Sequence, residues 1–137
     1  MSLINFNVFK TQLLGLSHKV ASTATSPPVL QKLHWLPIQQ RIIFKVLCFT
    51  YKCMSKEALT YLCDLLTPHI PARSLRSESQ LLLSVPRIKT ASFGERSFSF
   101  AAATYWNCLP YDIRQAPTLQ SFRTHLKTFL FKQAFLM

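Results

Sequence analysis

The strongest helical pattern in the chain runs from Pro37 to Met54 and reads PIQQRIIFKVLCFTYKCM. Apolar residues recur there at the 3.6-residue period over nearly the whole circumference of a helix. The remaining narrow stripe consists of Arg41, Lys45, Cys48 and Lys52. Because a helix that is apolar almost all round must be covered by its neighbours, we expect this segment to lie at the centre of the fold. Its non-apolar edge is basic, which is typical either of a phosphate-facing ridge or of a solvated face.

Apolar periodicity predicts further helices on both sides of this segment. The predicted helical segments are 3–20, 27–36, 37–54, 56–66, 95–109 and 118–130. Pro27 and Pro28 suit a first helical turn, where the backbone N–H has no partner in any case. Thr118 can cap the last helix, because its hydroxyl can accept a hydrogen bond from an unpaired N–H of the first turn.

Two short apolar runs, 81–85 and 88–93, predict strands joined by a proline-containing turn. The sequence therefore predicts a mainly α fold, a small helical domain of five to six helices with a short two-stranded β-hairpin near residues 81–93. Residues 1–26 are expected to form an N-terminal helix and a connector rich in Ser, Thr and Pro. Residues 27–137 are expected to form the helical domain.

The excess of positive charge is the most informative feature of the composition. The 137 residues include 16 Lys and Arg but only 5 Asp and Glu, so the net charge is +11. A hydrophobic fraction of 49% with 15% charged residues excludes an intrinsically disordered chain, which needs few apolar residues. Positive charge without internal partners indicates a polyanionic ligand, either nucleic acid or an anionic membrane surface. Alternatively, the excess charge keeps an apolar, acid-poor protein soluble.

No arrangement of residues in the sequence is typical of catalysis. Gly15 and Gly94 are too far apart for a phosphate-cradling loop, and few acids are available for paired-carboxylate catalysis. Neither the four cysteines, Cys48, Cys53, Cys63 and Cys108, nor the four histidines show metal-ligand spacing. We therefore predict a protein that is not an enzyme, with no catalytic residue, metal, cofactor or small-molecule substrate. Free cysteines that act as small hydrophobes favour a reducing, intracellular location, the nucleus or the cytoplasm.

Basic residues interleaved with aromatic and hydroxyl side chains form the candidate site. The loop Arg73–Ser77 holds two guanidinium groups, which bind phosphate bidentately, and two hydroxyl donors. The candidate nucleic-acid-binding residues are Arg41, Lys45, Lys52, Arg73, Arg76, Arg87, Lys89, Arg96, Arg123 and Lys127. Such residues hold a phosphate backbone without reading its sequence. Tyr51, Tyr105 and Trp106 could stack on bases, but each lies in an apolar helix and is expected in the core.

A series of motifs occurs in one order over residues 27–131. They are Leu33–Pro37 (LHWLP), Arg41–Lys45 (RIIFK), Tyr51–Lys52, Tyr61–Leu66 (YLCDLL), Arg73–Ser77 (RSLRS), Val85–Arg87 (VPR), Phe93–Phe98 (FGERSF), Trp106–Pro110 (WNCLP), Ile113–Arg114, Phe122–Arg123 and Leu126–Lys127. With these motifs the chain resembles the C-terminal region of reverse transcriptases from non-LTR retrotransposons, the long interspersed elements of the jockey and chicken-repeat type.

The resemblance implies a segment that follows the catalytic domains of its parent polyprotein. In that family the endonuclease and the polymerase lie upstream, and Asp64 and Asp112 match neither catalytic box. The region after the polymerase is thought to help hold template RNA or target DNA. One departure concerns residues 53–60, where the family usually has a turn containing Gly and Pro. Since no glycine is available for a positive φ, either a different turn must join the two helices or they must form one continuous helix.

The expected function is that of a non-catalytic remnant of a reverse transcriptase C-terminal segment, which binds RNA or DNA backbone non-specifically. The alternative is a helical structural or interaction module, or a decayed open reading frame, with no nucleic-acid role of its own. Expected partners are RNA or DNA, together with upstream reverse-transcriptase segments where these are expressed together. No membrane partner is expected, because no uninterrupted apolar stretch of about 18 residues occurs and no helix pairs a wide basic face with a wide apolar one.

Overall fold

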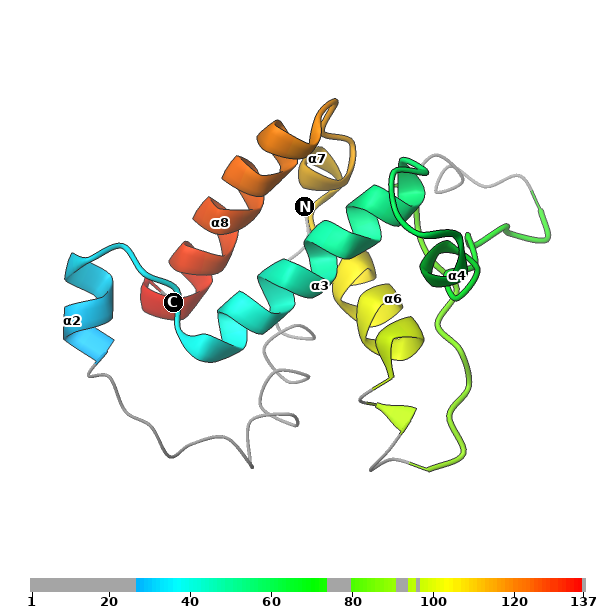
Figure 1. Ribbon diagram of the computed structural model, residues 1–137, viewed down its shortest axis with the longest axis horizontal. Coiled ribbons are helices and arrows are strands. Elements are labelled where there is room, and N and C mark those ends of the chain that lie inside the picture. Colours follow the sequence, from blue (N-terminus) through cyan, green and yellow to red (C-terminus); the bar gives the residue numbers. More distant parts are fainter. Residues whose placement is uncertain (1–26, 74–79, 91–93, 96, 137) are drawn as a thin grey trace.

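The computed structural model describes residues 27–73, 80–90, 94–95 and 97–136 (Figure 1). Its helices are α2 (Pro27–Lys32), α3 (Ile38–Met54), α4 (Thr60–Cys63), α6 (Phe98–Cys108), α7 (Tyr111–Arg114) and α8 (Leu119–Phe135). Within these ranges no strand is formed, and the predicted mainly α fold of a small helical domain is confirmed. The helix predicted at 3–20 and the connector that follows it lie outside the described residues.

Helix α3 is central, as its sequence predicted. It packs against α8, α6 and α4, and Figure 1 shows it running between α8 and α6. Its inward face buries Ile43, Leu47 and Tyr51, of which Leu47 has no exposed surface at all. Burial of these side chains removes their apolar surface from water, at about 25 cal/mol per Å², and this face therefore holds the other helices together.

The core contains the aromatic side chains that were expected there. The Tyr51 ring stacks on Phe122 of α8 with ring centroids 4.6 Å apart. The Trp106 ring of α6 lies 5.8 Å from the Phe122 ring, centroid to centroid. The Tyr51 hydroxyl donates a hydrogen bond of 2.8 Å to the Ala116 carbonyl, so its polar tip is satisfied inside the core. Tyr105 and Trp106 are also buried, which confirms that these three aromatics belong to the core.

The outward face of α3 is not covered. Ile38, Ile42 and Phe49 are 48%, 53% and 48% exposed, although all three belong to the apolar pattern of the helix. The expectation that neighbours would cover almost the whole circumference is therefore wrong for this side. The physical reason is that the main contacts of α3, with α8, α6 and α4, leave these three side chains largely in solvent.

Helix α3 ends in a left-handed turn that uses no glycine. Lys56 has φ of 57°, its N–H donates to the Cys53 carbonyl, and the next N–H, of Glu57, donates to the Lys52 carbonyl at 2.8 Å. This pair of hydrogen bonds is the Schellman motif, which normally places Gly at the left-handed position. The turn therefore has a lysine where glycine is usual. The helix predicted at 56–66 is wrong over most of its length, because only Thr60–Cys63 is helical there.

The same motif ends α2 and positions the segment that leads into α3. His34 has φ of 53° and donates its N–H to the Gln31 carbonyl, while the Trp35 N–H donates to the Leu30 carbonyl at 2.9 Å. The His34 ring also stacks on Phe131 of α8, 5.3 Å between centroids. These contacts fix the path of the chain at Trp35, three residues before α3 begins.

The predicted hairpin near residues 81–93 is wrong for its described part, and 91–93 lie outside the described residues. Leu83 instead forms an isolated antiparallel bridge with Pro68. Its N–H and carbonyl both bond to the Asn107 side-chain amide, at 2.8 and 2.7 Å, and the Leu81 carbonyl accepts from Trp106 Nε1 at 2.7 Å. Because side chains of α6 satisfy these backbone groups, the segment needs no second strand.

The C-terminal half agrees more closely with the predicted elements. Helix α6 lies within the predicted 95–109, and α8 begins where expected, since the Thr118 hydroxyl accepts a hydrogen bond from the Ser121 N–H at 3.2 Å. Helix α8 continues to Phe135, beyond Leu130, the last residue of its predicted inner face. The single turn α7, between Pro110 and α8, was not predicted.

Candidate nucleic-acid interface

A groove runs along the line where α3 and α8 lie side by side. It consists of two adjoining hollows of about 440 and 410 Å³, which share Arg41, Phe44 and Arg123 in their walls. Helix α3 forms one wall, α8 the other, and the segment His34–Leu36 closes one end. We call this feature the α3–α8 groove.

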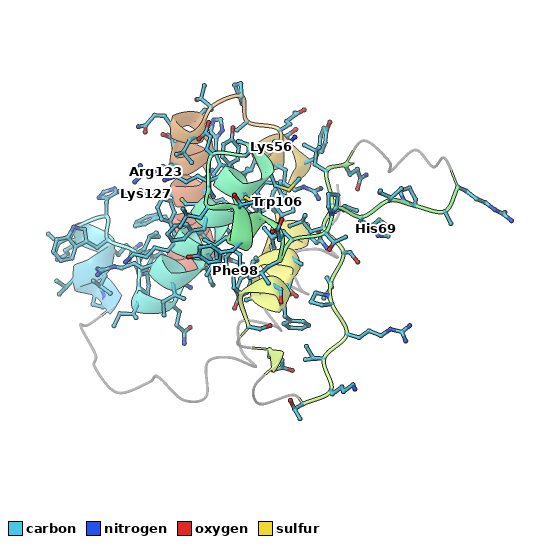
Figure 2. The ribbon with its side chains drawn as sticks, turned by 45° about the vertical axis from the view of Figure 1, so that its right-hand side comes forward. Lys56, His69, Phe98, Trp106, Arg123 and Lys127 are labelled. Carbon is cyan, nitrogen blue, oxygen red and sulfur yellow. The ribbon has the colours of Figure 1, made fainter. Side chains whose placement is uncertain are left out.

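Five of the ten predicted site residues line the α3–α8 groove. Helix α3 contributes Arg41, Lys45 and Lys52, and α8 contributes Arg123 and Lys127, which Figure 2 labels on the flank of that helix. The three α3 residues follow one stripe because they lie four and seven positions apart, and the α8 pair lies one turn apart. The packing of α3 against α8 therefore brings together two basic edges that are far apart in the sequence.

The other five predicted residues do not belong to the groove. Arg73 is exposed on the loop after α4, and Arg87 and Lys89 are exposed on the extended segment before α6. Arg76 and Arg96 lie outside the described residues. The predicted Arg/Ser loop is consequently described only at its first residue, Arg73.

The charge in the groove is uncompensated. Among the described residues that line the two hollows, none is Asp or Glu. Burial raises the pKa of the Cys48 thiol on the groove floor, while the positive charges of Arg123 and Lys52 act in the opposite direction. Both cations therefore lie near this thiol, and the groove has a positive potential along the wall of α3 and the wall of α8.

Arg41 is held in place before any ligand arrives. Its Nε donates a hydrogen bond of 2.7 Å to the Leu36 carbonyl, and its guanidinium carbon lies 5.6 Å from the centroid of the Trp35 ring. A cation over an aromatic face is attracted by the ring quadrupole. The terminal nitrogens of the fork are not used by these two contacts, so they can donate to a phosphate in a fixed geometry.

Sequence reasoning missed the aromatic members of the groove. Trp35 and Phe49 line its two hollows and are 56% and 48% exposed, while Phe44 is half-buried in the wall between them. A signal was present in the sequence, since Phe49 lies four residues after Lys45 and is therefore adjacent to the basic stripe on a helix. Only the packing of the helices shows that these rings are left uncovered.

The described part of the chain has neither a metal-ligand cluster nor a membrane-crossing helix. No group of three or more His, Cys, Asp or Glu there could hold a metal ion. The four cysteines are thiols rather than disulfides. Burial raises the pKa of the Cys53 thiol to about 11, and its contact to Cys63 acts in the same direction. None of the described helices is both long enough and apolar enough to cross a membrane.

Comparisons of the chain with models of protein families, with curated proteins and with solved structures gave no match. The fold and the groove define the class: a small helical domain with a cationic groove between two of its helices.

Proposed function

We propose that the domain binds the phosphate backbone of RNA or DNA in the α3–α8 groove, without base sequence specificity and without catalysis of its own. In this proposal the chain is a remnant of the C-terminal segment of a retrotransposon reverse transcriptase, in keeping with the motifs of its sequence. The observation that carries the proposal is the convergence of five cations from two helices on one groove whose described lining includes no acid.

The spacing of the cations favours a polyanion over a small anion as the ligand. The cations are spread along the groove rather than gathered at one point, so they suit a row of phosphates better than a single one. Arg41 supplies an oriented guanidinium, whereas the lysines supply flexible point charges that follow a backbone of any sequence. Contacts of this kind give affinity without base readout.

The test is binding to single-stranded RNA and to duplex DNA at several salt concentrations. Each phosphate neutralised on a single strand contributes a slope of about −0.7 to log K against log salt, so five contacts predict a slope of roughly −3.5. The affinity should then fall roughly 100-fold between 50 and 200 mM salt. Affinity that is undetectable at low salt, or that does not change with salt, contradicts the proposal.

Two matched triple variants distinguish the effect of the groove cations on binding from the effect of net charge. The groove variant is Lys45→Gln, Arg123→Gln and Lys127→Gln; the control variant is Arg73→Gln, Arg87→Gln and Lys89→Gln. Both remove three positive charges from the net +11. The groove variant should reduce the salt slope by about 2, whereas the control should keep the wild-type slope to within about 0.5. If both variants weaken binding equally, net charge and not the groove is responsible.

A second candidate function is a packing module for another protein segment, and the uncovered apolar face favours it. Val29 and Leu33 of the α2 region and Ile38 and Ile42 of α3 are each about half exposed. In a parent polypeptide, upstream reverse-transcriptase segments would cover this face. Size-exclusion chromatography distinguishes the two functions: self-association that nucleic acid leaves unchanged and that Ile38→Ser with Ile42→Ser abolishes favours the packing module.

A further inference from the structure

We infer that the α3–α8 groove takes single-stranded nucleic acid in preference to duplex, with unpaired bases stacked on Trp35 and Phe49. This inference rests on the proposed function and adds the form of the nucleic acid that is bound. It starts from two aromatic rings in the groove that remain exposed, whereas the core aromatics Tyr51, Trp106 and Phe122 are buried.

The two exposed rings lie in different hollows of the groove. Trp35 lines the hollow that contains Lys127, and Phe49 lines the one that contains Lys45 and Lys52. Along α3, the eleven residue steps from Ile38 to Phe49 correspond to about 16 Å at 1.5 Å per residue. The cations that both hollows share, Arg41 and Arg123, lie between these rings, so the order along the groove is aromatic, cationic, aromatic.

This order fits an unpaired strand. A single strand exposes both its phosphates and the faces of its bases, and each base that stacks on a protein aromatic contributes to affinity whatever its identity. A duplex exposes its phosphates and base edges but not the faces of its bases, because the bases are already stacked on one another. Duplex binding would therefore use the cations and leave Trp35 and Phe49 in water.

Trp35 is already held in position as a stacking platform. Its backbone N–H is bonded to the Leu30 carbonyl behind the left-handed turn at His34, whose ring stacks on Phe131. The Arg41 guanidinium lies 5.6 Å from the centre of the Trp35 ring and limits its rotation. A ring that is ordered in the free protein loses little entropy when a base stacks on it, which strengthens binding.

The test compares three polyanions: a single-stranded oligothymidine of about ten nucleotides, a blunt duplex of the same length and inorganic polyphosphate of equal charge. The variants are Trp35→Ala and Phe49→Ala, with Tyr61→Ala as the matched control, because Tyr61 is an exposed aromatic of α4 outside the groove. Phe49→Ala should weaken binding of the single strand about 5- to 100-fold and leave polyphosphate binding within about 2-fold. Trp35→Ala also removes the ring beneath the Arg41 guanidinium, so it should weaken polyphosphate binding slightly and single-strand binding at least about 5-fold more. Tyr61→Ala should change neither.

Intrinsic fluorescence gives an independent readout on the unmodified protein. The chain has two tryptophans, and Trp106 is 1% exposed while Trp35 is 56% exposed. Oligothymidine should therefore quench the emission of Trp35, and polyphosphate should bind without that quenching. The quenching should disappear in Trp35→Ala and persist in Tyr61→Ala.

The outcomes separate this inference from the proposed function. The stacking inference is overturned by equal affinity for the single strand and the duplex, with no loss in either groove variant and no quenching. The proposed function remains intact in that case if polyphosphate binding depends on salt. Failure to bind any of the three polyanions at low salt overturns both. Since Trp35 and Phe49 are separate exposed positions, agreement between their two variants excludes a folding defect in one of them as the cause.

Discussion

The α3–α8 groove and the connection between α4 and α6 both carry exposed positive charge in their described parts, and they differ in what supports it. In the α3–α8 groove, the cations project from two helices that pack directly on the core. In the connection between α4 and α6, Arg87 and Lys89 lie on the described segment 80–90, whose backbone is bonded to side chains of α6 at Leu81 and Leu83. Charge count alone does not distinguish these regions, but the rigidity of their supports does, because a site binds well when its groups are already in place.

The support of each region can be removed separately. Phe122 anchors α8 to α3 and α6 and thereby fixes the distance between the groove walls. Asn107 and Trp106 fix the extended connection. Lys56 lies in the turn that ends α3, ahead of α4 and of the connection. Substitutions at these positions test whether the two regions have separate supports, and they follow in decreasing order of the expected change in stability.

The largest effect is expected for Phe122→Ala. The Phe122 side chain has no exposed surface and contacts the rings of Tyr51 and Trp106, so its removal leaves a cavity at the junction of three helices. We expect the free energy of unfolding to fall by about 3–5 kcal/mol, measured by urea denaturation. The control His125→Ala, at an exposed position of the same helix, should change it by less than about 0.5 kcal/mol. A loss below about 1.5 kcal/mol would mean that Phe122 does not anchor the groove walls.

An intermediate effect, confined to the connection, is expected for Asn107→Ala. The N–H and carbonyl of buried Leu83 would lose their partners, at a cost of about 1–3 kcal/mol. Hydrogen exchange should accelerate at the Leu83 amide and remain slow in α3 and α8. Gln115→Ala, an exposed amide after α7, is the control and should be neutral. Equal acceleration in the groove helices would show that the two regions share one support.

The smallest effect, and a stabilising one, is expected for Lys56→Gly. A side chain at φ of 57° is strained, and glycine at the left-handed position of a Schellman motif relieves this strain. We expect a gain of about 1 kcal/mol, seen as a rise in the thermal midpoint of roughly 3–5 °C. Lys45→Gly, within the regular part of α3, should instead lose about 1 kcal/mol. A fall in stability for Lys56→Gly would contradict the assigned turn.

Local signals in the sequence were sufficient for the long elements. The periodic apolar patterns placed α3, α6 and α8, and the capping hydroxyl of Thr118 placed the start of α8. They were not sufficient where distant residues decide the structure. Leu83 lies in a run typical of a strand, but the Asn107 side chain takes its hydrogen bonds from 24 positions away.

The candidate site was predicted in parts rather than as a whole. The basic stripe of α3 and the basic pair of α8 were each visible, because residues one turn apart share a helix face. That these edges face each other depends on helix packing, which no local pattern specifies. The exposure of Trp35 and Phe49 was missed for the same reason, since an aromatic residue in an apolar segment is buried only if a neighbouring element covers it.

The groove joins residues that are widely separated along the chain, and this affects when the site comes into existence. Arg41 and Lys127 line the same hollow although they are 86 positions apart in the sequence. During synthesis α8 leaves the ribosome after every other described helix, so the nascent chain carries α3 and its charges well before it has a second groove wall. A ligand of the complete groove therefore binds the folded protein and not its precursors. By mass action it raises the melting temperature, and it draws late folding intermediates toward the native state.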